Sequence, residues 1–127
     1  MDIDYWLDEL TTENKELRLA AIEMLGLSGE TGVTGHLVEQ LKERDEEIRA
    51  EAVEAMGALN DTMAITYLMD AISDNSSLVR TSAAIALGKL KDSRSVYVLE
   101  RALNDKDIDV RWRAAEALNA MGCNPLK

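Results

Sequence analysis

The apolar residues of this chain return in one helical pattern at a fixed interval of 31 residues. The interval is marked by four arginines, which are Arg18, Arg49, Arg80 and Arg111. In the copy VRTSAAIALGKL, apolar side chains at Val79, Ala83, Leu87 and Leu90 follow offsets of 0, 4, 8 and 11. These offsets describe one face of an α-helix. The pattern therefore predicts a helix in each copy.

Small residues occupy two columns on or beside this helical face. The first column is alanine in every copy: Ala21, Ala52, Ala83 and Ala114. The second column is glycine in three copies and asparagine in the last: Gly26, Gly57, Gly88 and Asn119. Small side chains at these places allow a second helix to approach closely. We therefore expect helices packed in direct contact.

A second helix is predicted after the first one in each unit. The column between them holds Gly29, Asn60, Lys91 and Gly122, and glycine and asparagine tolerate the left-handed conformation at a helix end. Apolar residues then recur at i, i+3 and i+7, as in Ile65, Leu68 and Ile72. Each unit is therefore expected to be a short helical hairpin.

The same register organises the whole chain into one all-α domain over residues 1–127. It predicts a lone helix at 2–10, hairpins near 14–42, 45–73 and 76–104, and a final helix near 107–122. A single hairpin cannot bury its apolar face, whereas stacked neighbours can. We therefore expect an α-solenoid of about eight helices.

The repeated motif resembles that of a known family. The segment from Asp74 to Asp92 reads D-x-x-x-x-V-R-x-x-A-A-x-A-L-G-x-L-x-D, which is similar to the HEAT-like repeat of the phycobilisome-lyase type. The resemblance implies a right-handed solenoid of HEAT-like hairpins. It also implies that each arginine pairs with the acid six residues earlier, which gives Glu43–Arg49, Asp74–Arg80 and Asp105–Arg111. Thr12 replaces the acid in the first unit, so this tie is not expected there.

Charge and cysteine content narrow the range of partners. The chain carries 14 basic and 24 acidic residues, a net charge of −10, which repels phosphate backbones and anionic membranes. We therefore expect no nucleic-acid or membrane ligand. The single cysteine, the lack of a long apolar run and the lack of a basic signal-peptide start favour a cytoplasmic protein.

Related enzymes were considered against the residues that their chemistry needs. Deoxyhypusine hydroxylase holds iron through His-Glu pairs, but the one histidine here, His36, is followed by Leu37. The bilin lyases share this repeat, and nothing in the sequence marks a chromophore pocket. Asp105, Asp107, Asp109 and Glu116 match the spacing of a calcium loop, yet Val110 stands where that loop needs glycine. We expect no catalytic residue, no cofactor and no metal.

The resemblance places the second helices on the concave face, so their outward columns are the predicted binding surface. The candidate residues are Asp8, Glu39, Tyr67, Asp70, Tyr97 and Arg101. The carboxylates among them fit a partner with a basic segment, and the aromatic rings fit interface anchors. The predicted function is a non-catalytic scaffold or adaptor. The alternative is a subunit or regulator of an enzyme complex such as a bilin-lyase-like assembly.

The two ends of an array lack one neighbour each and leave apolar surface open. We expect Trp6 to close the start of the stack, and Trp112 with Leu126 to close its end. If they do not, the ends are expected to pair in a weak homodimer. The chain is accordingly expected to be a monomer or a weak homodimer.

Overall fold

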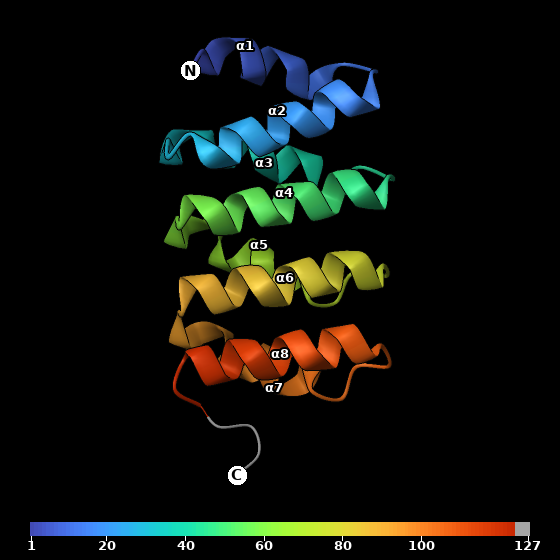
Figure 1. Ribbon diagram of the computed structural model, residues 1–127, viewed down its shortest axis with the longest axis vertical. Coiled ribbons are helices and arrows are strands. Elements are labelled where there is room, and N and C mark those ends of the chain that lie inside the picture. Colours follow the sequence, from blue (N-terminus) through green and yellow to red (C-terminus); the bar gives the residue numbers. More distant parts are fainter. Residues whose placement is uncertain (124–127) are drawn as a thin grey trace.

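The computed structural model describes residues 1–123 and contains eight α-helices stacked in two layers (Figure 1). The long helices are α2 (Lys15–Leu27), α4 (Glu46–Leu59), α6 (Ser77–Leu90) and α8 (Ile108–Ala120). The short helices are α1 (Ile3–Asp8), α3 (Thr34–Gln40), α5 (Ile65–Ala71) and α7 (Val96–Ala102). Figure 1 shows α3, α5 and α7 behind the layer of long helices. The predicted all-α solenoid is confirmed.

Short 3₁₀ turns complete the units. The turns η2 (Thr31–Val33), η3 (Thr62–Ala64) and η4 (Ser93–Ser95) lead into α3, α5 and α7, while η1 (Glu9–Thr11) follows α1. Across residues 1–123 no strand occurs, and no helix has the length and apolar character needed to cross a bilayer.

Each long helix begins and ends through residues at the 31-residue register. Its N-cap is a polar residue whose side chain accepts a bond from a backbone N–H of the first turn, and these residues are Asn14, Asp45, Ser76 and Asp107. Beyond each long helix, the backbone is left-handed at Gly29, Asn60, Lys91 and Gly122. Lys91 adopts this conformation with φ of 52° despite its Cβ, which costs about 1 kcal/mol. Lys91 therefore differs from Gly29, Asn60 and Gly122 in its residue type but shares their backbone conformation.

The small-residue columns pack the long helices against one another. Ala21, Ala52, Ala83 and Ala114 are fully buried. Gly57 of α4 lies against Ala86 of α6, so closely that a Cβ on this glycine would come within 2.7 Å of the Cβ of Ala86. Gly26 and Gly88 meet Ala55 and Ala117 in the same way, at 2.8 and 3.0 Å. The expected close approach is confirmed, and it runs from each glycine to an alanine of the next unit.

The two ends of the stack differ. Trp6 is half-buried against the core and packs edge-on against Tyr5 with ring centroids 4.8 Å apart, as expected for a residue that closes the first end. Trp112 is 64% exposed, so the prediction that it closes the other end is wrong. Leu19 and Thr81 hold the equivalent position on α2 and α6, and another long helix follows each of those helices. Trp112 lies on α8, which is the last long helix described. Leu126 lies outside the described residues.

Candidate binding surface

Three of the four repeated arginines form a ladder that joins each unit to the next one. Arg49 binds Asp74 through its Nε and Nη2 atoms, both at 3.0 Å, and Arg80 binds Asp105 at 2.9 and 3.3 Å. Arg18 pairs with Glu43 at 3.0 Å. We call these three pairs the arginine ladder. In each pair the carboxylate lies 25 residues after the arginine.

The predicted pairs Glu43–Arg49, Asp74–Arg80 and Asp105–Arg111 are therefore wrong. The arginine does meet the residue six positions earlier, but at its backbone carbonyl: Arg80 donates to the oxygen of Asp74 at 2.8 Å and Arg111 to that of Asp105 at 2.7 Å. The carboxylate of Asp74 is instead bound by Arg49 of the preceding unit. Each acid thus gives its carbonyl to one arginine and its side chain to another.

The observed pairing also changes which unit lacks an ion pair to its neighbour. Arg18 pairs with Glu43, so the absence of an acid at Thr12 does not leave the first unit unlinked. Arg18 donates to the carbonyl of Thr12 at 3.0 Å, a bond that needs no particular side chain. Arg111 has no carboxylate partner among the described residues.

The ladder sets the ionisation of its carboxylates. Burial by itself would raise the pKa of Asp74, but the hydrogen bonds from Arg49 and from the N–H of Ser76 outweigh it and hold that pKa below its ordinary value. The pKa of Asp105 is lowered in the same way, against burial, by the N–H of Asp107 and by Arg80. Both carboxylates are therefore ionised at neutral pH.

Two open grooves lie above the ladder, between successive short helices. The first, which we call the apolar groove, lies between α3 and α5 and has a volume of about 270 Å³. It is lined by Val38, Leu41, Lys42, Arg49, Tyr67, Asp70, Ala71, Asp74 and Val79. Apolar side chains make most of its wall, while Tyr67, Asp70 and Lys42 are exposed.

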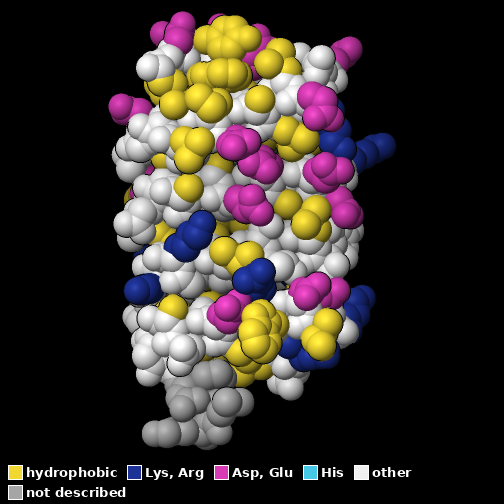
Figure 2. Space-filling model, in the orientation of Figure 1, with side chains coloured by type: hydrophobic (Ala, Val, Ile, Leu, Met, Phe, Trp, Pro, Cys, Tyr) yellow, Lys and Arg dark blue, Asp and Glu magenta, His cyan; other side chains and the backbone are white. Residues whose placement is uncertain are grey.

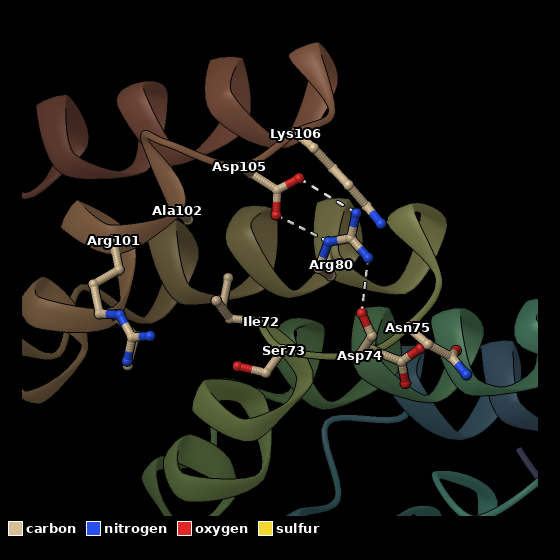
Figure 3. Close-up of a pocket in the computed structure, with 10 residues that line it drawn as sticks. Ile72, Ser73, Asp74, Asn75, Arg80, Arg101, Ala102, Asp105 and Lys106 are labelled. Atoms are coloured by element: carbon tan, nitrogen blue, oxygen red, sulfur yellow. Dashed lines mark hydrogen bonds and ion pairs between the residues drawn. The ribbon is translucent and has the colours of Figure 1, made fainter.

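The second, which we call the cationic groove, lies between α7 and the residues that follow α5, and it has a volume of about 400 Å³ (Figure 3). It is lined by Ile72, Ser73, Asp74, Asn75, Arg80, Val98, Arg101, Ala102, Asp105 and Lys106. Figure 3 shows Lys106 beside the pair of Arg80 and Asp105, with Arg101 on the far side of Ile72. Asp74 lines both grooves, which therefore adjoin.

The six predicted binding residues are all exposed, and three of them line the two grooves. Tyr67 and Asp70 line the apolar groove, and Arg101 lines the cationic groove. The Tyr97 ring lies 5.8 Å from the guanidinium carbon of Arg101, within the range of a cation–π contact.

The other two predicted residues line neither groove. Asp8 is exposed on α1, and Glu39 pairs with Lys42 at 3.3 Å. Both share with Asp70 and Arg101 the exposed side of the short helices, which we call the short-helix face. That this face is the concave one stays a prediction.

Two groove cations were missed by sequence reasoning. Lys42 stands in the column of Ser73, and Lys106 stands in the column of Asn75, both in the loops that follow the short helices. Both columns change charge between units, but the sequence does not show that either side chain faces a groove.

The opposite side of the stack, which we call the long-helix face, carries a different charge pattern. Figure 2 shows carboxylates gathered over α2 and α4, with lysine and arginine more frequent over α6 and α8. Glu23, Glu51 and Glu54 line one shallow groove there. The pKa of Glu51 is raised by burial and by repulsion from Glu54 and Glu23. These carboxylates repel one another.

No three His, Cys, Asp or Glu side chains converge on a metal-binding point within residues 1–123. The calcium-like spacing has another explanation here. Asp105 is bound by Arg80, and Asp107 caps α8 by accepting the N–H groups of Asp109 and Val110 at 2.8 and 3.3 Å. These carboxylates serve the ladder and the helix cap.

The stack of helical hairpins places this chain in the class of α-solenoid repeat proteins. The family model for HEAT repeats matches residues 3–88 and 72–125, which together take in nearly the whole chain. This chain therefore belongs to the HEAT-repeat family. Among curated proteins, no sequence matches it closely enough to count as a relative.

Solved structures with the same fold are longer than this chain. One is the complex of CpcE and CpcF of phycocyanin lyase from Nostoc sp. PCC7120, with a TM-score of 0.85, 23% identity, 96% of this chain and 54% of that chain covered. Another is human deoxyhypusine hydroxylase in complex with glycerol, with a TM-score of 0.81, 23% identity and coverage of 95% and 43%. An engineered protein matches with a TM-score of 0.73, 22% identity and coverage of 98% and 64%. At this identity the likeness shows the fold alone.

Proposed function

We propose that this chain is a non-catalytic interaction module whose short-helix face binds a segment of a partner protein. The observation that carries this proposal is the pair of adjoining grooves above the arginine ladder. They stand at equivalent positions of successive units, and they differ in the side chains that line them. Repeats conserve the residues that pack the units, whereas the exposed lining is free to be shaped by a ligand.

The charges on the short-helix face favour a partner segment that carries lysine or arginine where it lies along α1, α3 and α5. Asp8, Glu39 and Asp70 occupy one column of α1, α3 and α5, and all three are exposed. Tyrosine and arginine are enriched at protein interfaces and dominate the binding energy there. The exposed residues Tyr67, Tyr97 and Arg101 supply these groups here.

The proposal is tested by selecting ligands from a phage-displayed library of random peptides against the whole chain. The selected clones are then tested against a variant with Tyr67→Ala and Asp70→Lys. A matched control variant, Leu27→Ala with Glu23→Lys, makes one apolar truncation and one charge reversal on the long-helix face. We expect the first variant to lose most clones and the control to keep them. Clones that respond only to the control variant would place the binding site on the other face.

A second function is favoured by the likeness to the phycocyanin lyase complex, whose structure holds two proteins together. This chain would then act as a subunit or regulator of a lyase-like assembly. It spans about half of the chain that it matches, so the rest of such an activity would lie elsewhere. Titration with a linear tetrapyrrole, followed by visible absorption, tests this alternative. A saturable spectral change that needs the folded chain would favour it.

A further inference from the structure

We propose that the partner segment is an extended peptide of mixed charge, with a basic residue, a neighbouring bulky apolar residue, and an acidic residue three positions from the apolar one. The apolar residue enters the apolar groove, and the acidic residue enters the cationic groove. This inference rests on the proposed function and adds to it the chemistry and the spacing of the ligand.

The apolar groove selects an apolar side chain with a cation beside it. Arg49 and Asp74 neutralise each other in its floor, and Lys42 is engaged by Glu39 at 3.3 Å. Asp70 has no ion pair within the described residues and stands exposed at the rim. A volume of about 270 Å³, walled largely by apolar residues, accommodates a leucine or phenylalanine side chain.

The cationic groove selects an acid. Its two carboxylates are already occupied, since Asp74 is held by Arg49 and Asp105 by Arg80. Arg101 and Lys106 line the same groove, and neither has a carboxylate partner in the part of the chain that the structure describes. The groove therefore carries two uncompensated positive charges in a molecule whose net charge is −10. A carboxylate of the partner that enters this groove would be attracted by both charges.

The spacing follows from the repeat. The two grooves adjoin at Asp74 and are related by one unit of the stack. The repeat distance of the stack is set by the long helices, since α4 packs directly against α6, and packed helices lie about 8–10 Å apart. A polyproline II chain rises about 3.1 Å per residue with three residues per turn, so residues i and i+3 face the same way about 9 Å apart. One extended peptide thus reaches both grooves with side chains three positions apart.

The test uses two synthetic fluorescent peptides, Ser-Lys-Leu-Pro-Pro-Glu-Ser and its reverse, because either chain direction satisfies the grooves. Each is compared by fluorescence anisotropy with a form in which glutamate is replaced by lysine. We expect one direction to bind the unaltered chain at least tenfold more tightly in its glutamate form. The double variant Arg101→Glu with Lys106→Glu should reverse this preference.

A charge-matched control, Lys89→Glu with Arg113→Glu on the long-helix face, changes the net charge by the same amount. It should keep the preference for glutamate, because both residues line a groove remote from the peptide. Equal binding of the glutamate and lysine forms, a preference unaffected by the Arg101 and Lys106 changes, or no binding of either direction would overturn the inference.

The same measurements separate this inference from the proposed function. If phage clones depend on Tyr67 and Asp70 but show no acid three positions from an apolar residue, the interaction role stands and the ligand inference fails. If the clones are insensitive to the short-helix face, both fail. If clones that depend on this face carry the mixed-charge pattern, both are supported.

Discussion

The guanidinium of Arg49 binds both carboxylate oxygens of Asp74, which lies 25 residues further along the chain. The same side chain donates to the backbone carbonyls of Glu43 and Arg44, each at 2.8 Å. One arginine therefore fixes the loop before its own helix and the loop of the following unit. Because the side chains of Arg49 and Asp74 are only 12% and 18% exposed, water replaces these bonds poorly.

Breaking one rung of the ladder should destabilise the fold. Asp105→Asn leaves the 8% exposed side chain of Arg80 without a counter-charge and should lower the free energy of unfolding by about 2–3 kcal/mol. Asp70→Asn is the matched control, since an exposed carboxylate without an ion pair in residues 1–123 should change stability by less than about 0.5 kcal/mol. Urea unfolding of both variants measures the difference. Equal, small effects would show that the ladder contributes little.

The effect of Asp105→Asn should depend on pH. The folded pKa of Asp105 lies below the unfolded value of 3.8, so its contribution is present above pH 3.8 and is lost as pH falls through the folded pKa. The gap between the unaltered chain and Asp105→Asn should therefore be constant near neutral pH and narrow below pH 3.8. Urea unfolding over a pH series measures the gap. A gap that widens in acid would contradict this.

The contact between glycine and alanine should not tolerate a methyl group. Gly57→Ala would place a Cβ 2.7 Å from the Cβ of Ala86 and should cost about 1–3 kcal/mol, more than the helix propensity gained. Gly35→Ala is the matched control on α3, where nothing lies within 4 Å of the added carbon, and it should be neutral or slightly stabilising. Thermal unfolding by circular dichroism compares them. Similar melting temperatures would mean that α4 and α6 separate at little cost.

Removing the charge of Glu51 should stabilise the chain at neutral pH. Its folded pKa lies above 4.5, so the protonated form is favoured in the fold, and that gain is lost as pH rises through the folded pKa. Glu51→Gln should therefore raise the melting temperature at pH 7 and leave it nearly unchanged at pH 4. The comparison at pH 4 serves as the internal control. An equal rise at both pH values would point to packing in place of charge.

Tryptophan fluorescence distinguishes the two ends. Trp112 is 64% exposed, while Trp6 is half-buried against the core. Acrylamide, which is neutral and insensitive to the net charge, should quench the Trp6→Phe variant more strongly than the Trp112→Phe variant. Quenching of Trp112 that weakens as protein concentration rises would instead show that this end pairs with a second copy.

The helices were predictable because packing imposes the same residue types at each repeat. The alanine and glycine columns gave both the helical face and the close approach, and the structure confirms them at Ala83 and Gly57. The arginine partners were not predictable from sequence distance, because Asp74 is nearer to Arg80 along the chain but presents only its carbonyl to it. The grooves escaped prediction for a related reason, since Lys42 and Lys106 lie in loops whose direction depends on the stack.

The forward contacts of Arg18, Arg49 and Arg80 join successive units in the same way at three places in the stack. Deleting residues 27–57 would bring Gly26 against Ala86 and Arg18 against Asp74, which are the residue types that meet at the joints already present. A gene encoding such a chain can gain or lose one 31-residue block by unequal recombination, and the residues at the new contact between units still match. The number of grooves can therefore change by one repeat unit at a time. The length of the partner segment that the chain can bind changes with it.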